Sequence, residues 1–557
     1  MTSRPVKPDR EAVFLRLLVE AADGQTGTEL ALRAAVETQL DSDAAGSPWR
    51  VARLFGPPDT EEERGLARFF EVTGHVVASP TYPPHKLAFD LARELAEAAN
   101  VRVDPDLPSS AFEPPPGAMP SPEARGVFSD DRPPHPAAAA RNWARVAIRC
   151  PEAWALQPPP GGAAMGAGIA IGHPDTGYTE HVELEAGALD LGRDRDVIAD
   201  DDDALDPLER RRFWLDQPGH GTATGSVIIG RPAGDLGGVA PRATLVPIRT
   251  VKSVVQVFDG DVAKAIDHAR RVGCGVISMS LGGVGFSRAL GEAITAAVQH
   301  GMIVLAAAGN YVGFVTAPAT DPNCLAIAAT NAVDEPWSYS SHGSAVDFSA
   351  PGQDVWVAIA RPEEGPPRRA IGQSDGTSFA VAHAAGAAAL WLAHHGRDSL
   401  IERYGAPNVQ RVFLELVSRS SRKPPGWDER EHGVGILDAE ALLRAPLPDH
   451  PRESRLAAAR PVERDTLARI NEKCPELSRE ELSDRLAEGL GVEPAELEAG
   501  LERVGGELAY LLNEDRGLRE HLVRPEATAL SGERRAPLVN DLRRAGSRSL
   551  LAQLGLP

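Results

Sequence analysis

GTSFAVAHAAGAAALWLAHHG, the stretch from Gly376 to Gly396, predicts the central element of the fold. Apart from His383, small or apolar residues fill it from Phe379 to Trp391, so we expect a helix that is buried on all sides and ends near Gly396. Ser378 stands at the start of this helix, where unpaired backbone N–H groups favour negative charge. Such a serine is either the cap of a core helix or a nucleophile whose reaction creates an oxyanion there.

Apolar runs alternate with helical patterns from about residue 142 to residue 447, which is typical of an α/β domain with a largely parallel sheet. Strands are predicted at GIAIG (168–172), ATLVPIR (243–249), GVISMSL (275–281), MIVLAAAG (302–309) and CLAIAAT (324–330). Helices are predicted at 261–273 and 288–301. Polar residues at the carboxyl ends of such strands are candidates for a site.

Three residues of this domain have the chemistry that a serine nucleophile needs, namely a base, a group that orients the base, and oxyanion donors. Asp175 follows the first strand, His220 opens a short apolar helix between glycines, and Asn310 ends the strand at 302–309. Each has an alternative interpretation, because Asp175 and Asn310 are also common turn residues and His220 could be a helix cap. Their occurrence together with Ser378 favours the catalytic interpretation.

The motifs around these residues are similar to those of subtilisin-like serine peptidases, the subtilases. The three motifs are DTG at Asp175, HGT at His220 and GTSxA at Ser378. Further similar segments, in the family's order, are GVAPRATLVPIR, SMSLGG, AAAGN, SSHGSAVDFSAPG and GVGILDAEALL. The resemblance covers roughly residues 140 to 447 and implies a three-layer subtilisin-like domain with a mostly parallel sheet.

The resemblance also implies the role of each residue. Ser378 would attack the scissile carbonyl, His220 would act as base and then acid, and Asp175 would orient the imidazole. Asn310 and the Ser378 N–H would hold the oxyanion. Extended substrate backbone would pair with two edges, formed by Ser280, Leu281 and Gly282, and by Ala307, Ala308 and Gly309.

Some residues depart from the family pattern or suggest other chemistry. Ala382 stands where a proline is usual, and His173 lies two residues before Asp175, where the strand is usually apolar. His173 is either a packed histidine or a neighbour of Asp175 on the same strand face. The acidic run Asp200, Asp201, Asp202 and Asp203 suggests either a calcium site or a solvated loop, and the proposed chemistry needs no metal or cofactor.

The flanking regions differ in composition from the α/β domain. We expect a helical segment at 1–46, an α+β unit at 47–110, a Pro-rich linker at 111–139, the catalytic domain at 140–447 and a helical domain at 448–557. The α+β unit has the position of a subtilase propeptide, and its pattern is compatible with the ferredoxin-like inhibitory propeptides of that family. The C-terminal helices, framed by a capping box at Ser478 and Glu481 and by Pro494, would bind a protein partner or pack on the catalytic domain.

Composition limits the classes of function. With 58 basic and 79 acidic residues the chain carries a net charge of -21, which argues against nucleic acid and anionic membranes as partners. The first 24 residues show no secretory signal, and the four scattered cysteines suggest free thiols, so we expect a cytoplasmic protein.

We therefore predict a serine endopeptidase that cuts extended peptide segments. The alternative is a catalytically restrained scaffold that acts through its helical flanks, which the presence of Asp175, His220, Asn310 and Ser378 disfavours. A sedolisin-type acid peptidase is disfavoured as well, because HGT stands where that family uses a glutamate.

Overall fold

The computed structural model describes residues 12–21, 26–40, 46, 48–57, 62–79, 82–108, 133–184, 188–209, 217–232, 234–255, 257–283, 287–450, 470, 474, 477–490, 492–523 and 531–556. The chain forms two compact units. One combines residues 1–107 with 463–557, and the other holds nearly all of residues 108–462, so the second unit is inserted into the sequence of the first. No helix among the described residues is long and apolar enough to span a bilayer.

A seven-stranded parallel sheet forms the centre of the inserted unit, in the order β11-β10-β9-β8-β5-β7-β6. The strands are β5 (Ala170–Asp175), β6 (Arg195–Asp196), β7 (Thr244–Arg249), β8 (Val276–Met279), β9 (Ile303–Ala307), β10 (Leu325–Thr330) and β11 (Phe348–Pro351). A separate hairpin joins β12 (Val355–Ala358) to β13 (Ile371–Ser374). All five predicted strands are confirmed, because parallel strands are covered on both faces and therefore appear as apolar runs.

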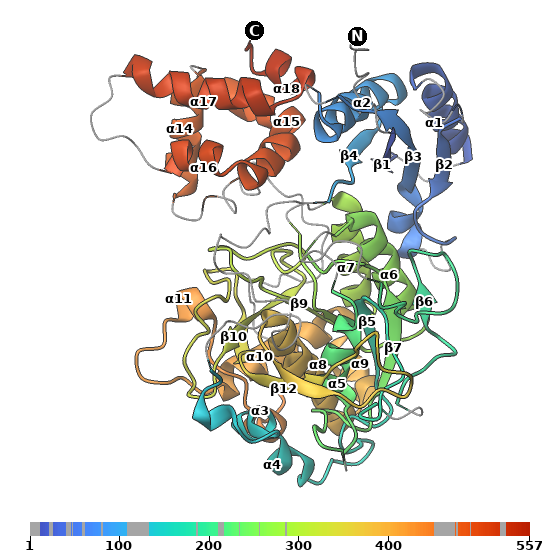
Figure 1. Cartoon of the computed structure of the whole chain (residues 1–557), viewed down its shortest axis with the longest axis vertical. Helices are drawn as coiled ribbons and strands as arrows, with labels where there is room; N and C mark the ends of the chain where they lie inside the picture. Colours follow the sequence, from blue (N-terminus) through green and yellow to red (C-terminus); the bar gives the residue numbers. More distant parts are fainter. Residues whose placement is uncertain are drawn as a thin grey trace, which may run out of the picture. The chain divides into compact units, whose positions relative to one another are not determined.

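Helices surround this sheet (Figure 1). Helix α8 (Thr377–His395) packs along β8, β9, β10 and β11, and it is buried from Thr377 to His394, as the all-apolar stretch predicts. The other helices are α3 (Trp143–Ala147), α4 (Cys150–Trp154), α5 (His220–Ile229), α6 (Asp259–Arg271), α7 (Arg288–Gln299), α9 (Arg397–Tyr404), α10 (Val409–Ser420), α11 (Glu429–His432) and α12 (Ala439–Arg444). Two short 3-10 helices are η2 (Pro136–Ala138) and η3 (Ala406–Asn408).

The N-terminal part of the other unit is a ferredoxin-like βαββαβ fold. Its elements are β1 (Ala12–Glu20), α1 (Thr26–Gln39), β2 (Arg50–Arg53), a 3-10 helix η1 (Glu62–Arg68), β3 (Phe69–Val77), α2 (Pro84–Ala99) and β4 (Arg102–Pro105). The antiparallel sheet has the order β2-β3-β1-β4. The predicted ferredoxin-like pattern is therefore present in the structure.

The predicted boundary of this α+β unit at residue 47 is wrong, because the segment 1–46, predicted to be helical, contains the central strand β1 as well as the helix α1. Apolar residues at Phe14, Leu15, Leu18 and Val19 fit helical spacing, but Leu15, Leu17 and Val19 also fit the two-residue period of a strand. Pairing with both β3 and β4 decides in favour of the strand. Most of the predicted linker, 109–132, lies outside the described residues.

The C-terminal helices are α14 (Arg479–Leu490), α15 (Pro494–Glu514), α16 (Arg516–Val523), α17 (Ser531–Ala545) and α18 (Arg548–Gln553). The predicted capping box is confirmed, since Glu481 N–H donates to Ser478 Oγ at 3.2 Å and Ser478 N–H donates to Glu481 Oε2 at 2.8 Å. Buried leucines of these helices form their own core. The sequence predicted these helices correctly, but it did not predict which other part of the chain they pack on.

That part of the chain is helix α2 of the ferredoxin-like fold. Lys86 Nζ donates to the carbonyl of Arg544 at 2.6 Å, and Ser549 N–H donates to Asp90 Oδ1 at 2.8 Å. The Phe89 ring lies 5.7 Å from the Tyr510 ring, centroid to centroid. Polar and aromatic contacts thus join the two ends of the sequence into one unit.

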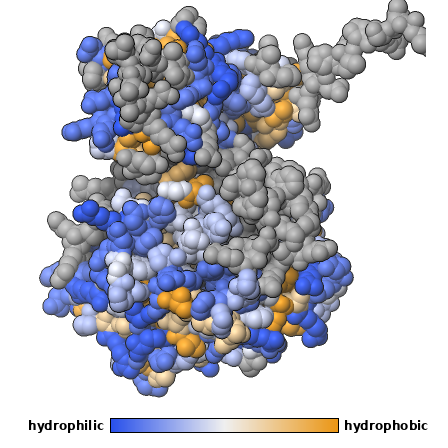
Figure 2. Space-filling model, turned by 60° about the vertical axis from the view of Figure 1, so that its left-hand side comes forward, coloured by the Kyte–Doolittle hydropathy of each residue, from blue (hydrophilic) through white to orange (hydrophobic). Residues whose placement is uncertain are grey.

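On the face of the molecule shown in Figure 2, hydrophobic residues form small separate spots among hydrophilic ones. All four cysteines, Cys150, Cys274, Cys324 and Cys474, are buried and form no disulfide, which confirms the prediction of free thiols.

Candidate active site

Asp175 is the last residue of β5, which lies between β8 and β7 near the middle of the sheet. Its side chain is fully buried, and its Oδ1 accepts a hydrogen bond from Thr176 N–H at 2.7 Å. The chain then turns at Gly177, with a φ of 101°, where a Cβ would lie only 2.3 Å from Ala204 O. The DTG sequence therefore places a carboxylate at the carboxyl end of a central strand, as predicted.

His220 is the first residue of α5 and is also fully buried. The glycine after it is required, because a Cβ at Gly221 would lie 2.1 Å from Gly177 O and 3.2 Å from Asp175 Cβ. This close approach brings His220 Nδ1 within 2.7 Å of Asp175 Oδ1. Since a carboxylate only accepts, Nδ1–H is the donor, and Nε2 is buried with no hydrogen-bond partner among the described residues.

The charge of the carboxylate is stabilised by this arrangement. Burial by itself raises the pKa of Asp175, but the charge of His220 and the hydrogen bond from it lower that pKa, so that it ends below its ordinary value. Asp175 thus remains ionised, and His220 is held in one tautomer with Nε2 available to a reacting group.

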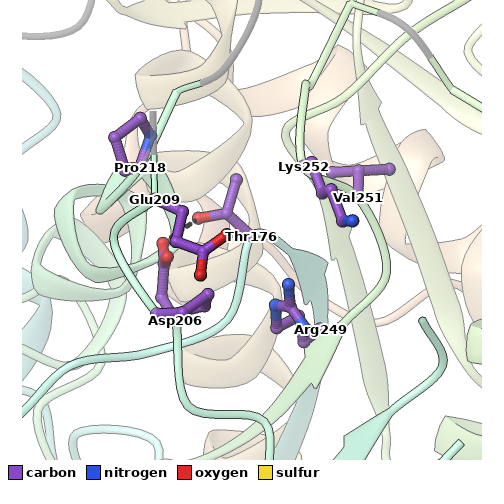
Figure 3. A pocket seen from close by; sticks show the side chains of 8 residues that line it. Thr176, Asp206, Glu209, Pro218, Arg249, Val251 and Lys252 are labelled. Carbon is purple, nitrogen blue, oxygen red and sulfur yellow. Dashed lines mark hydrogen bonds between the residues drawn. The ribbon is translucent and has the colours of Figure 1, made fainter. Parts of the chain in front are cut away.

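Asp206 links the Asp175 turn to the loop before His220. Its Oδ2 accepts hydrogen bonds from Thr176 Oγ1 at 2.8 Å and from Gly219 N–H at 2.7 Å, and its Oδ1 accepts one from Leu208 N–H at 2.8 Å. Burial raises the pKa of this carboxyl, and the three donors partly oppose the shift. Figure 3 shows Asp206 and Glu209 on one side of a pocket that Arg249 and Lys252 line on the other.

Ser378 is the second residue of α8, and Gly376, whose φ is 152°, is the residue just before this helix. Its carbonyl accepts a hydrogen bond from Ser280 Oγ at 2.9 Å. The Phe379 ring lies 6.4 Å from the His220 ring, centroid to centroid, so the first turn of α8 is next to the start of α5. The structure thereby brings Ser378 and the pair of His220 and Asp175 to one place.

Asn310 faces the same turn. Its Oδ1 accepts hydrogen bonds from Thr377 N–H at 2.9 Å and from Thr377 Oγ1 at 2.8 Å, which orients the side-chain amide so that Nδ2 points the other way. A Cβ built on Gly376 would lie 3.6 Å from Asn310 Nδ2 and 3.6 Å from Ser378 N. Two N–H donors from different elements therefore border one space that glycine leaves empty.

Known proteins resemble large parts of this chain. The sequence model of the Subtilase family matches residues 166–420. Thermitase from Thermoactinomyces vulgaris is 31% identical over 293 residues, which are 52% of this chain and 92% of thermitase. The chain belongs to the subtilase family.

This subtilase is a serine endopeptidase of the subtilisin-like type. A second curated relative matches it over a shorter stretch. Subtilisin E from Bacillus subtilis is 35% identical over 189 residues, which are 33% of this chain and 48% of subtilisin E. The crystal structure of fervidolysin from Fervidobacterium pennivorans, described as a keratinolytic enzyme related to subtilisin, shares the fold with a TM-score of 0.52 and 19% identity. That match covers 80% of this chain and 63% of fervidolysin.

The substrate-contacting residues that the sequence suggests stay a prediction. Ser280, Leu281 and Gly282 follow β8, and Gly282 N–H donates to Val254 O at 2.9 Å in this structure. Ala307 ends β9, Ala308 N–H donates to Ile327 O at 2.9 Å, and Gly309 N–H donates to Thr377 Oγ1 at 3.2 Å. The amides of Gly282, Ala308 and Gly309 are therefore already bonded within the subtilase chain.

The acidic run does not form a ready ligand cluster. Asp200 and Asp202 both pair with Arg195, and no group of three or more His, Cys, Asp or Glu side chains suited to a metal was found in the described part of the chain. The calcium hypothesis stays a prediction.

Ala382, which stands where the family pattern has a proline, is fully buried within a continuous α8. The next residue, His383, bonds Phe379 O through Nδ1 at 2.8 Å.

Two residues of the site carried no sequence signal. Asp206 follows the acidic run and looks like one more loop carboxylate, and Thr224 lies inside an apolar helix start. Their hydrogen bonds to the Asp175 region depend on long-range packing between β5, α5 and the loop that joins them.

Proposed function

We propose that this subtilase hydrolyses peptide bonds in extended polypeptide segments with Ser378 as nucleophile, His220 as general base and acid, and Asp175 as the group that orients His220. The observation that carries the proposal is the buried 2.7 Å hydrogen bond between His220 Nδ1 and Asp175 Oδ1, with His220 Nε2 unbonded among the described residues. A base with one ring nitrogen fixed and the other available is what a serine hydroxyl requires.

In this mechanism Ser378 Oγ attacks the carbonyl carbon while its proton passes to His220 Nε2. The negative charge that develops on the carbonyl oxygen is held by Asn310 Nδ2 and Ser378 N–H, which border the space above Gly376. His220 then gives its proton to the leaving amine, and a water molecule repeats the sequence on the acyl ester. Asp175 stays ionised throughout and offsets the charge of the imidazolium.

A fluorophosphonate probe tests these roles, because it labels only an activated serine. We expect the full chain to be labelled and Ser378→Ala to remain unlabelled. Ser420→Ala is the matched control, since Ser420 lies on α10 and its hydroxyl bonds two carbonyls of its own helix, Leu416 O and Val417 O. Equal labelling of the full chain and Ser378→Ala would contradict the peptidase mechanism and favour a scaffold.

The N-terminal ferredoxin-like fold is proposed to restrain this activity. It precedes the catalytic unit in the sequence, as a subtilase propeptide does, and a Pro-rich stretch separates the two. Cleavage in that stretch, followed on a denaturing gel, should raise the rate of probe labelling once the N-terminal fragment is removed. A labelling rate that does not change after its removal would contradict the restraint.

The cytoplasmic location also stays a proposal. Four buried free thiols support a reducing compartment. Fractionation of cells, with the chain detected by antibody, tests it, and recovery outside the cells would contradict it.

A further inference from the structure

The carboxylate of Asp175 is held from both of its oxygens. Oδ1 accepts hydrogen bonds from His220 and from Thr176 N–H. Oδ2 accepts one from Thr224 Oγ1 at 3.2 Å, and Thr224 lies one helical turn after His220 on α5. The same helix therefore contacts the two sides of the carboxylate.

A second histidine lies behind this threonine. His173 Nε2 is 3.0 Å from Thr224 Oγ1 and 3.7 Å from Asp175 Oδ2, and the His173 side chain is 1% exposed. His173 and Asp175 are two residues apart on β5 and so lie on one face of the strand. Gly225 lies close to the ring, since a Cβ there would be 4.0 Å from His173 Cε1.

The directions of these hydrogen bonds follow from the donors present. The Thr224 hydroxyl lies within hydrogen-bond distance of three groups that only accept, Asp175 Oδ2 at 3.2 Å, the His220 carbonyl at 3.1 Å and the Gly221 carbonyl at 3.4 Å, so its single proton is shared among them. The Thr224 oxygen can then accept, which makes His173 Nε2–H the donor. Burial lowers the pKa of His173, so the ring is neutral, and the titratable groups that act on it, among the described residues, are Asp175 and His220.

We propose that His173 is a positioning residue, whose Nε2–H acts through the Thr224 hydroxyl to hold Asp175 Oδ2, so that Oδ1 stays directed at His220. This inference rests on the proposed function of Asp175 and His220. Hydrogen bonds in a chain polarise one another, so His173 also makes the carboxylate a weaker base. A weaker base stabilises a neighbouring positive charge less, so loss of His173 should move the acidic limb of the pH profile upward.

Two replacements at position 173 test this. His173→Leu removes the donor but keeps an apolar side chain, whereas His173→Gln keeps an N–H at a similar distance from the backbone. We expect His173→Leu to lower kcat about tenfold and to move the acidic limb of the pH profile upward by about half a pH unit, and His173→Gln to restore both. The proposal would be overturned if His173→Leu kept the kcat and the pH profile of the wild type. It would also be overturned if both variants lost kcat equally and neither moved the acidic limb.

Thr224 provides an independent check in case His173→Leu folds poorly. Thr224→Val removes the hydroxyl at nearly constant shape and should shift the acidic limb as His173→Leu does, whereas Thr224→Ser should not. The double variant should shift it no further than either single change, because both break the same chain of hydrogen bonds. Additive shifts would show that His173 acts by another route.

A readout without turnover separates this inference from the proposed mechanism. In Ser378→Ala with ¹⁵N-labelled histidine, the proton between His220 and Asp175 gives a downfield resonance whose pH midpoint can be followed. We expect His173→Leu to raise that midpoint by about half a pH unit in this background as well. If the fluorophosphonate does not label the full chain but His173→Leu moves the midpoint of the resonance, the proposed mechanism fails and the role of His173 stands. If the full chain is labelled but His173→Leu leaves the midpoint where it was, only the role of His173 is overturned.

Discussion

Asp206→Asn should loosen the Asp175 turn and the loop before His220 together, because one carboxylate holds both. Asp206 Oδ2 accepts hydrogen bonds from Thr176 Oγ1 and Gly219 N–H, and Oδ1 accepts one from Leu208 N–H. An amide offers only one oxygen, so its nitrogen must face at least one of these donors. The variant loses a bond as well as the charge.

The loss in the free energy of unfolding caused by Asp206→Asn follows from those contacts. A buried donor left without an acceptor costs about 1–3 kcal/mol, and the remaining bonds weaken when the acceptor becomes neutral. Burial of the charge, which raises the pKa of Asp206, returns part of this cost on replacement. Because two of the three donors are fixed backbone groups, we expect a net loss of about 2–4 kcal/mol in the free energy of unfolding of the catalytic unit.

The assay combines urea unfolding, followed by hydrogen exchange in β5 and α5, with steady-state kinetics on a peptide substrate. We expect kcat to fall about 10- to 100-fold, because small displacements of catalytic groups have effects of that size. Glu209→Gln is the control, because Glu209 is exposed and lines the same pocket. This substitution should change the free energy of unfolding by less than about 0.5 kcal/mol. If Asp206→Asn matched Glu209→Gln in both measurements, the linking role of Asp206 would be refuted.

Three further predictions concern the oxyanion site and the other unit. Asn310→Ala should lower kcat about 100- to 1000-fold with little change in KM, as loss of an oxyanion donor does in subtilisin, and a loss below threefold in steady-state assays would contradict its role. Gly376→Ala should reduce probe labelling more than about 100-fold, since its Cβ would occupy the space beside Ser378 N at an unfavourable φ; labelling at the normal rate would refute this. Burial raises the pKa of Glu507 to about 7, so its contribution to stability is present below about pH 4.5 and is lost as the pH rises through 7. The protection factors of amides around Ser547, whose N–H and hydroxyl both bond Glu507, should therefore fall between pH 5 and 8 in the wild type, and an equal fall in Glu507→Gln would contradict it.

The fold of the catalytic unit was predictable because its strands are buried on both faces. Short continuous apolar runs bounded by turn residues, such as 302–309 and 324–330, are typical of strands that are covered on both faces. The N-terminal strand β1 was not predictable in this way. Its apolar residues fit both a helix and a strand, and only pairing with β3 and β4, which begin at Phe69 and Arg102, fixes it.

The candidate site was predictable where local sequence sets the geometry. The glycines beside Asp175 and His220 mark backbone positions where no side chain fits, and these form part of the recognisable motifs. Asp206 and Thr224 were missed because their contacts join segments whose spacing in the sequence is arbitrary. His173 was noticed as a neighbour of Asp175 on the strand, but the hydroxyl that connects the two comes from α5.

The contacts of α2 with α15 and α18 make the ferredoxin-like fold and the C-terminal helices a single split domain, with the catalytic unit as a long insertion between its halves. Shortening the chain at either end alone would therefore strip one half of its packing surface and leave Tyr510 or Phe89 without its aromatic neighbour. A cut in the Pro-rich stretch has a different effect, since the severed half would stay docked on the other through Lys86 and Asp90. Chain scission and dissociation are consequently two separate events in this molecule, and an isolated catalytic piece is best obtained by removing both halves at once.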